Sequence, residues 1–523
     1  MRRIQKRVMA SVLALGLFST TPVWAQEVTV LSKAAAHWPA PVEKTMQEIL
    51  QLMPELGDFQ LERSAGNEGD YQIVLRKNDH SYASFHINGN KGQLLMFQYV
   101  KEEQSDDKPV NLQQAEKQAV SFVNKMFANT GEEYNVYKVT PLFYREEIDG
   151  KQVVINRAEI MLRRMVNGIP FENDMIAIEV DASHQIIQYT RVRDKEIPDS
   201  AFPDPRPAIA KADIEKQFPS YMKLKYIENL PVERDKETGT IIKMVNLLEY
   251  TPTYVFTNSW YIDAATGKIN YVFDLDREKR EPLKLKPSAK TIVLKSSQEA
   301  AQFVKQQLGV ELDASMKLKE ATEAELGWKS YDWSLGKQGV SVKVDPNTGI
   351  LKSFGLLNQA GKTPINQNTA QKVAIGALEA YSGTDIREVV LSVRNLPGKD
   401  LFGDGKVVTE SYEFKFYKSH GGIPVIGPHH GEAYTVSIDP TTGKVSRFEN
   451  RYSESATTLP DAQNAITAEK AAELYLKAHP LQLVYTIQPI NGQAKEKPVL
   501  AYVASGDADA HIDAITGEVV TQK

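Results

Sequence analysis

The chain has 523 residues, of which 42% are hydrophobic, 25% are charged and none is cysteine. At roughly 150 residues per domain, this length predicts several hydrophobic cores in an ordinary globular protein. The lack of cysteine excludes disulfides, thiolate metal sites, a cysteine nucleophile and a lipid anchor on cysteine. A formal net charge of −5 without basic clusters argues against nucleic acid as a partner.

The first 25 residues have the pattern of an export signal. Four basic residues precede the short apolar run Val8–Phe18, and Val23-Trp-Ala25 matches a signal-peptidase site. We therefore expect cleavage after Ala25 and a protein that is secreted or associated with the cell envelope. No later stretch approaches ~18 uninterrupted apolar residues, so we expect no membrane span.

One hairpin pattern recurs along the chain. Apolar residues alternate up to an Asp, two variable residues follow, and Thr-Gly begins the return strand. The Asp can accept hydrogen bonds from turn amides, and we expect a positive φ at the Gly because a short β-loop needs one. The clear copies are Asp263 to Gly267, Asp345 to Gly349, Asp439 to Gly443 and Asp513 to Gly517, and weaker copies begin at Asn88 and Asp181.

The six turns form two sets of three. Corresponding turns lie 257, 258 and 250 residues apart along the sequence. Two further landmarks repeat at a similar interval: Asn111 matches Asn366, and the step Gly168-Ile-Pro-Phe171 matches Gly422-Ile-Pro-Val425. The chain therefore has the pattern of a tandem duplication of a three-unit block.

Amphipathic helices are predicted at the start of most units. Ser296 and Glu299 form a capping box, and Asn111 and Thr467 are suited to cap helices that follow them. One helix followed by several antiparallel strands makes an α+β unit whose helix covers one face of the sheet. The predicted fold is α+β, with six such units arranged as two duplicated halves of three.

These features together resemble the PepSY superfamily of exported proteins. The two long middle units resemble the YcdB/YcdC repeat family. The two Gly-Ile-Pro steps are similar to a step in the propeptides of secreted thermolysin-type zinc proteases. The resemblance implies a non-enzymatic role close to proteases or the cell envelope.

Unit boundaries follow from linkers rich in charge and proline. The linker Asp276–Lys290 separates the two halves. We expect a signal peptide at 1–25, PepSY-like units at 26–103, 207–278, 290–358 and 464–523, and YcdB/YcdC-like units at 108–195 and 364–453.

Catalytic signatures are missing from the sequence, so we predict no enzyme and no catalytic residues. There is neither a His-Glu-x-x-His zinc helix nor a Gly-x-Ser-x-Gly elbow. The segment Gly355–Thr363 imitates a phosphate-binding loop, but Pro364 follows where the helix of that motif would begin. We interpret this segment as a linker.

Two groups of polar residues could hold a metal ion. Zinc or copper would suit the first and calcium the second. We favour a polar loop for the first and a charged, protected edge strand for the second. We therefore predict no metal and no cofactor. The first group is His420, His429, His430 and Glu432, and the second is Asp507, Asp509, His511 and Asp513.

The Gly-Ile-Pro steps admit two interpretations. Proline restricts a strand to an edge or to its entry, which makes the steps structural. An exposed edge can instead bind an extended peptide, with Phe171 or Val425 docking in a partner. The sequence thus favours a secreted protein that binds and modulates an extracellular protease or peptide; the alternative is a scaffold that binds cell-wall material. It does not fix the oligomeric state.

Overall fold

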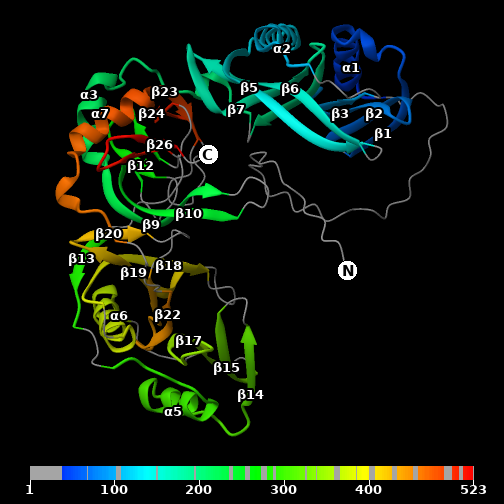
Figure 1. Cartoon of the computed structure of the whole chain (residues 1–523). Helices are drawn as coiled ribbons and strands as arrows, with labels where there is room; N and C mark the ends of the chain where they lie inside the picture. Colours follow the sequence, from blue (N-terminus) through cyan, green and yellow to red (C-terminus); the bar gives the residue numbers. More distant parts are fainter. Residues whose placement is uncertain are drawn as a thin grey trace. The chain divides into compact units, whose positions relative to one another are not determined.

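The fold is known from a computed structural model (Figure 1), which forms two compact units, Met1–Arg163 with Asp174–Arg193, and Arg164–Asn173 with Asp194–Lys523. The predicted signal peptide lies outside the described residues. None of the described helices is long and apolar enough to cross a membrane. The described residues are 38–67, 69–101, 108–148, 151–193, 196–234, 240–253, 260–271, 280–286, 290–323, 327–336, 338–357, 365–383, 386–399, 407–426, 433–451, 458–487, 497–505 and 510–521.

The first unit packs two helices against one antiparallel sheet and has a single hydrophobic core. The core takes Val42 and Met46 from α1, Phe122 from α2, and alternate strand residues such as Ile176 and Ile178. The strand order is β1-β2-β3-β4-β8-β7, with β6 beside β7 and β5 beside β6. The elements are α1 (Ala40–Leu52), η1 (Pro54–Leu56), β1 (Gln60–Asn67), β2 (Asp70–Asn78), β3 (Ser81–Asn88), β4 (Gln93–Val100), α2 (Leu112–Met126), β5 (Glu133–Ile148), β6 (Lys151–Val166), β7 (Ile169–Asp181) and β8 (Ile186–Arg193).

A second core of the same kind lies within the second unit, between Leu285 and Phe448. Its strand order is β14-β15-β16-β17-β22-β21-β19, with β18 beside β19 and β13 beside β18. The predicted linker at 276–290 is partly wrong, because β13 lies within it. The elements are β13 (Arg280–Lys284), α5 (Ser297–Gln307), β14 (Lys317–Glu323), β15 (Trp328–Leu335), β16 (Gln338–Val344), β17 (Leu351–Leu357), α6 (Gln367–Tyr381), β18 (Glu388–Lys399), β19 (Val407–His420), β20 (Ile423–Ile426), β21 (Tyr434–Ile438) and β22 (Val445–Asn450).

A third core, also in the second unit, joins the end of each half of the chain. In this core each half of the sequence adds its hairpin to the strands of the other half. The hairpin β11–β12 pairs through β11 with β24, and the hairpin β25–β26 pairs through β25 with β10. The 3-10 helix η3 and helix α7 meet through Phe218 and Tyr475, whose rings stack at 5.6 Å. The elements are η2 (Asp199–Ala201), α3 (Lys211–Gln217), η3 (Phe218–Tyr221), β9 (Lys223–Arg234), β10 (Ile241–Thr251), β11 (Trp260–Asp263), β12 (Ile269–Tyr271), η5 (Ala462–Asn464), α7 (Ala468–Ala478), β23 (Leu481–Thr486), β24 (Val499–Ala504), β25 (Ala510–Asp513) and β26 (Val519–Thr521).

The predicted turns and helix caps are confirmed. Glycines 267, 349, 443 and 517 have φ between 67° and 76°. Asn111 and Asn366 each accept a hydrogen bond from the third residue beyond them and each begin a helix of 15 residues. Ser296 and Thr467 cap α5 and α7 in the same way. Local sequence therefore decides where these elements begin and end.

The six predicted units do not each form a separate small sheet covered by one helix, as the sequence predicted. The α+β class holds, with strands in two sheets. The hydrophobic residues nevertheless gather into three large cores, in which predicted units 1 and 2, 4 and 5, and 3 and 6 share their interiors. A unit of about 70 residues alone buries a smaller fraction of its surface than a larger domain does, so shared cores are the more stable arrangement.

Candidate functional site

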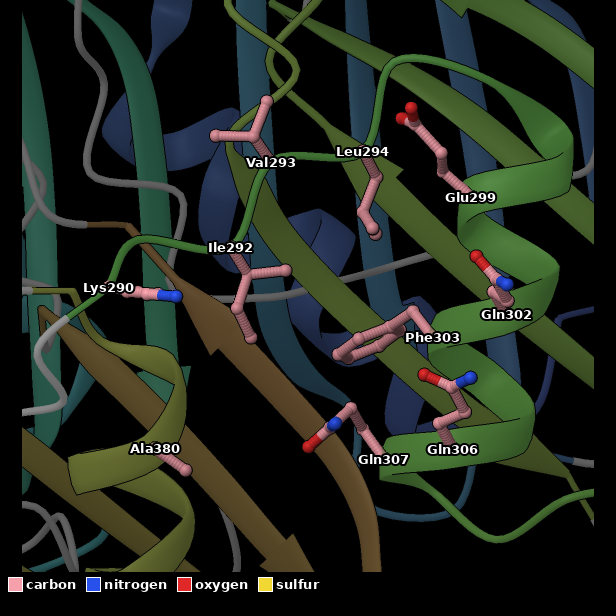
Figure 2. A pocket seen from close by; sticks show the side chains of 10 residues that line it. All are labelled: Lys290, Ile292, Val293, Leu294, Glu299, Gln302, Phe303, Gln306, Gln307 and Ala380. Carbon is pink, nitrogen blue, oxygen red and sulfur yellow. The ribbon is translucent and has the colours of Figure 1, made fainter.

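A hollow beside α5 is the candidate binding site among the described residues. It has a volume of about 440 Å³ and lies between α5, the extended segment before it and one residue of α6. Figure 2 shows Ile292, Leu294 and Phe303 directed into the space between segment and helix. The full lining is Lys290, Ile292, Val293, Leu294, Glu299, Gln302, Phe303, Gln306, Gln307 and Ala380.

The wall of the hollow opposite α5 is a short length of strand. Leu294 N–H donates to the Gly349 carbonyl at 2.8 Å, and Leu351 N–H donates to the Ile292 carbonyl at 3.0 Å. Val293 therefore occupies the non-hydrogen-bonded position of an antiparallel bridge with Ile350. In that position its own backbone N–H and C=O are directed away from Ile350, and its side chain is 43% exposed.

The helical wall carries amide side chains. Gln302 and Gln306 are one turn apart on α5, and Gln307 follows them at the helix end. The Glu299 carboxylate is engaged at the start of α5, where it accepts a hydrogen bond from the Lys295 N–H at 2.6 Å. Each glutamine amide can both donate and accept, so this wall suits a polar backbone rather than one fixed charge.

The Gly-Ile-Pro steps are not open edges, so the docking interpretation of Phe171 and Val425 is wrong. Phe171 is 1% exposed and pairs in parallel with Tyr485 of β23. Val425 is 4% exposed and pairs in parallel with Tyr226 of β9. The chain itself occupies both edges, which leaves the structural interpretation.

The two candidate metal groups are only partly described. His429, His430, Glu432, Asp507 and Asp509 lie outside the described residues. His420 packs edge-on against the Tyr226 ring at 5.6 Å. Within the described part of the chain no group of three or more His, Asp or Glu side chains could hold a metal ion.

The protective-edge interpretation of the last strands fails for β25. This strand is not at an edge, because it pairs with both β10 and β26. His511 is 3% exposed, and its Nε2 lies 3.1 Å from a Glu249 carboxylate oxygen. The other oxygen of Glu249 lies 3.3 Å from Lys225 Nζ, so three ionisable groups meet in a buried place. Sequence reasoning missed this cluster, whose residues come from β9, β10 and β25.

A second buried ionic network lies in the first unit. Arg191 donates to Asp174 at 3.2 and 3.1 Å and to Glu132 at 2.9 Å. Arg193 lies 3.3 Å from Asp174 and 3.4 Å from Glu132, which balances two positive with two negative charges. Burial, and then the Asp174 carboxylate, raise the pKa of Tyr134, whose hydroxyl donates to Asp174 at 3.1 Å. The network joins strands β5, β7 and β8.

The Asp of each turn has the predicted turn-forming role. Asp263 and Asp513 each accept two backbone N–H groups at 2.8–3.0 Å. The Thr348 N–H, followed by the Thr348 hydroxyl, lowers the pKa of Asp345. The imitation of a phosphate loop begins with Gly355, which lies within β17 and pairs with Ser341. Most of that segment lies outside the described residues.

One family of known proteins matches part of the chain. Residues 43–193 match the profile of the YcdB, YcdC repeated domain, which confirms the predicted resemblance to that family. The match covers both the unit predicted as PepSY-like at 26–103 and the YcdB/YcdC-like unit predicted at 108–195. No curated protein matches the chain.

Two solved structures have weaker likeness to the chain. The Bacillus megaterium YpeB C-terminal domain is 9% identical, over 63% of this chain and 99% of that chain, with a TM-score of 0.23. A europium-containing methanol dehydrogenase is 11% identical, over 76% of this chain and 70% of that chain, with a TM-score of 0.09. Scores this low carry no argument about function.

Proposed function

We propose that this protein is an exported, non-catalytic binding protein that binds extended peptide segments and modulates or inhibits an extracellular protease. The observation that carries the proposal is the hollow beside α5. There a strand with outward-directed backbone groups, an apolar floor and a wall of amide side chains meet.

The chemistry of the hollow suits an extended peptide. Such a peptide binds when its backbone pairs with an exposed strand and its alternate side chains enter a pocket. Val293 supplies the backbone groups, Phe303 and Leu294 supply the apolar floor, and Gln302 and Gln306 can bond to peptide groups of any sequence. Lys290 and Glu299 are the only ionisable residues of the lining, which favours binding over acid–base catalysis.

The proposed partner comes from the resemblance to protease propeptides, which pack on their enzymes. A protease that exposes or receives an extended segment would present what the hollow accepts. The experiment is to titrate the chain from Gln26 to Lys523 into thermolysin-like and subtilisin-like proteases. Cleavage rates and complex formation on gel filtration are measured together. Unchanged rates and no complex at micromolar concentration would contradict the protease as partner.

A matched pair of variants tests the hollow itself. Val293→Lys places a charge on the strand wall of the hollow, where Val293 is 43% exposed. The control Val519→Lys places the same charge outside the lining, at a residue that is 40% exposed. We expect the first variant to weaken binding by about tenfold or more and the second to leave it unchanged. Equal affinities of the two variants for the protease would show that the hollow does not contact the partner. Retention on isolated cell wall without protease binding would favour the envelope scaffold instead.

A further inference from the structure

One edge of the sheet in the first unit has no partner among the described strands. β5 pairs with β6, and no described strand lies on its other side. The first half of β5, residues 133–140, contains no glycine or proline and is rich in Tyr, Val and Thr, which favour extended structure. An edge of this composition is a template for another strand. The outer strand β14 contrasts with it, since four of its seven residues are charged.

The second core shows what covers the corresponding edge there. β18 begins seven residues after α6 ends, just as β5 begins seven residues after α2 ends. Val389 and Leu391 of β18 face the second core, as Tyr134 and Val136 of β5 face the first. The outer edge of β18 is covered by β13, the segment that precedes α5 in the chain.

The pairing of β13 with β18 has a defined register. Leu283 lies opposite Val389, and Leu285 N–H donates to the Arg387 carbonyl at 2.9 Å. Leu285 is buried in the second core, and Leu283 packs against it. Val389 and Leu391 of β18 therefore direct their backbone N–H groups toward β13. By the same spacing, the N–H groups of Tyr134 and Val136 are directed toward the open edge of β5.

The sequence before α1 contains a segment of the same kind. Val28-Thr-Val-Leu31 alternates apolar residues, as Leu283 and Leu285 do. Ala40 begins α1 ten residues after Val30, and Ser297 begins α5 twelve residues after Leu285. Ten extended residues span up to about 33 Å, so the two connections have comparable reach.

We propose that residues 26–31 add to the open edge of β5 as an antiparallel strand, with Val28 opposite Tyr134 and Gln26 opposite Val136. The occupant is thus a segment of this chain, and the pairing reproduces that of β13 with β18. Val28 and Val30 then cover the margin of the first core, and the N–H groups of Tyr134 and Val136 gain acceptors. The duplicated parts of the chain close their sheets by the same device.

Hydrogen exchange of backbone amides in the chain from Gln26 to Lys523 tests this strand. The change is Val28→Asp with Val30→Asp, which puts charges on the face that meets the core. We expect the amides of Tyr134 and Val136 to exchange on the order of tenfold faster in this variant. Equal exchange in the variant and the parent chain would overturn the proposal. The control Ala34→Asp with Ala36→Asp carries the same added charge outside the strand and leaves exchange unchanged.

A second change shows that the measurement detects loss of an edge strand. Leu283→Asp disturbs the β13 pairing, and we expect faster exchange at Val389 and Leu391 while Tyr134 stays protected. A peptide of residues 26–33 added to the double-Asp chain should restore protection. Light scattering on the parent chain then separates two sources of the strand. A monomer supports the proposal, and protection that appears only in a dimer overturns it in favour of exchange between copies.

Discussion

Single residues of the Asp-x-x-Thr-Gly turns have clear physical roles. Asp345 accepts the N–H groups of Asn347 and Thr348 at 3.0 and 2.8 Å, and the Gly349 N–H donates to its carbonyl at 2.9 Å. These bonds favour the charged carboxylate, which is why its pKa is lowered. A lowered folded-state pKa contributes stability above the unfolded value of about 3.9. That contribution is lost as the pH falls through the folded value.

Gly349 gives the sharpest prediction at this scale. Its φ is +74°, and a Cβ there would meet the Leu294 carbonyl oxygen at 3.1 Å. Gly309 has φ +63° with nothing within 4 Å of the same added atom. We expect Gly309→Ala to cost about 1 kcal/mol for the left-handed conformation and Gly349→Ala about 2 kcal/mol or more. Urea unfolding of the second core measures both, and equal costs would show that the close approach is easily relieved.

At the scale of elements, the two exchanged hairpins meet nearly equivalent strands. Lys225 of β9 lies opposite Glu249 of β10, and Val484 of β23 lies opposite Ala501 of β24. His511 of β25 and Tyr261 of β11 occupy the matching place on the exchanged strands. One side thus buries Lys, Glu and His where the other buries Val, Ala and Tyr. The same arrangement of strands therefore accommodates either set of side chains.

This internal comparison predicts the effect of substitution. Glu249→Ala alone removes the carboxylate that lies beside the buried Lys225 ammonium, and we expect a loss of about 3–5 kcal/mol. The triple change Lys225→Val, Glu249→Ala and His511→Tyr copies the apolar side, and we expect stability to be unchanged or raised by about 1–4 kcal/mol. Thermal unfolding measures both. A triple variant less stable than the single one would show that the ionic cluster is required on its own side.

At the scale of the whole molecule, the third core ties the two halves of the sequence together. The Ala264 N–H donates to the Leu500 carbonyl, and the Ala514 N–H donates to the Leu248 carbonyl, at 3.0 and 2.7 Å. Tyr226 also reaches the Pro460 carbonyl at 3.0 Å. Each half therefore completes a sheet that the other half begins, and neither can close the third core alone.

Removal of the last hairpin tests this dependence. A chain that ends at Ser505 lacks β25 and β26, which uncovers β10 and removes the donor to Leu248. We expect the amides of β10, β11 and β24 to lose protection together, because they belong to one core, while the second core keeps its protection. Hydrogen exchange gives the readout. Loss confined to β10 would contradict a single cooperative third core.

Much of the local structure could be predicted because its causes are local. Asn111, Ser296 and Thr467 cap helices through hydrogen bonds that span three residues. The turn glycines take the positive φ that a short turn between two strands requires. Alternating burial at Ile176, Ile178 and Val180 follows from the period of a strand. The α+β class and the YcdB/YcdC likeness follow from these patterns.

Strand partners and the candidate site depended on tertiary structure. Each strand edge offers the same backbone groups, so sequence pattern cannot say that β25 pairs with β10 rather than with the strands preceding it in its own half. For the same reason, the sequence did not predict the pairing of Phe171 with Tyr485 or the strand within 276–290. The hollow joins residues of two helices and one extended segment. The sequence by itself determined the turns, caps and helices, and packing over long sequence separations decided which edges meet.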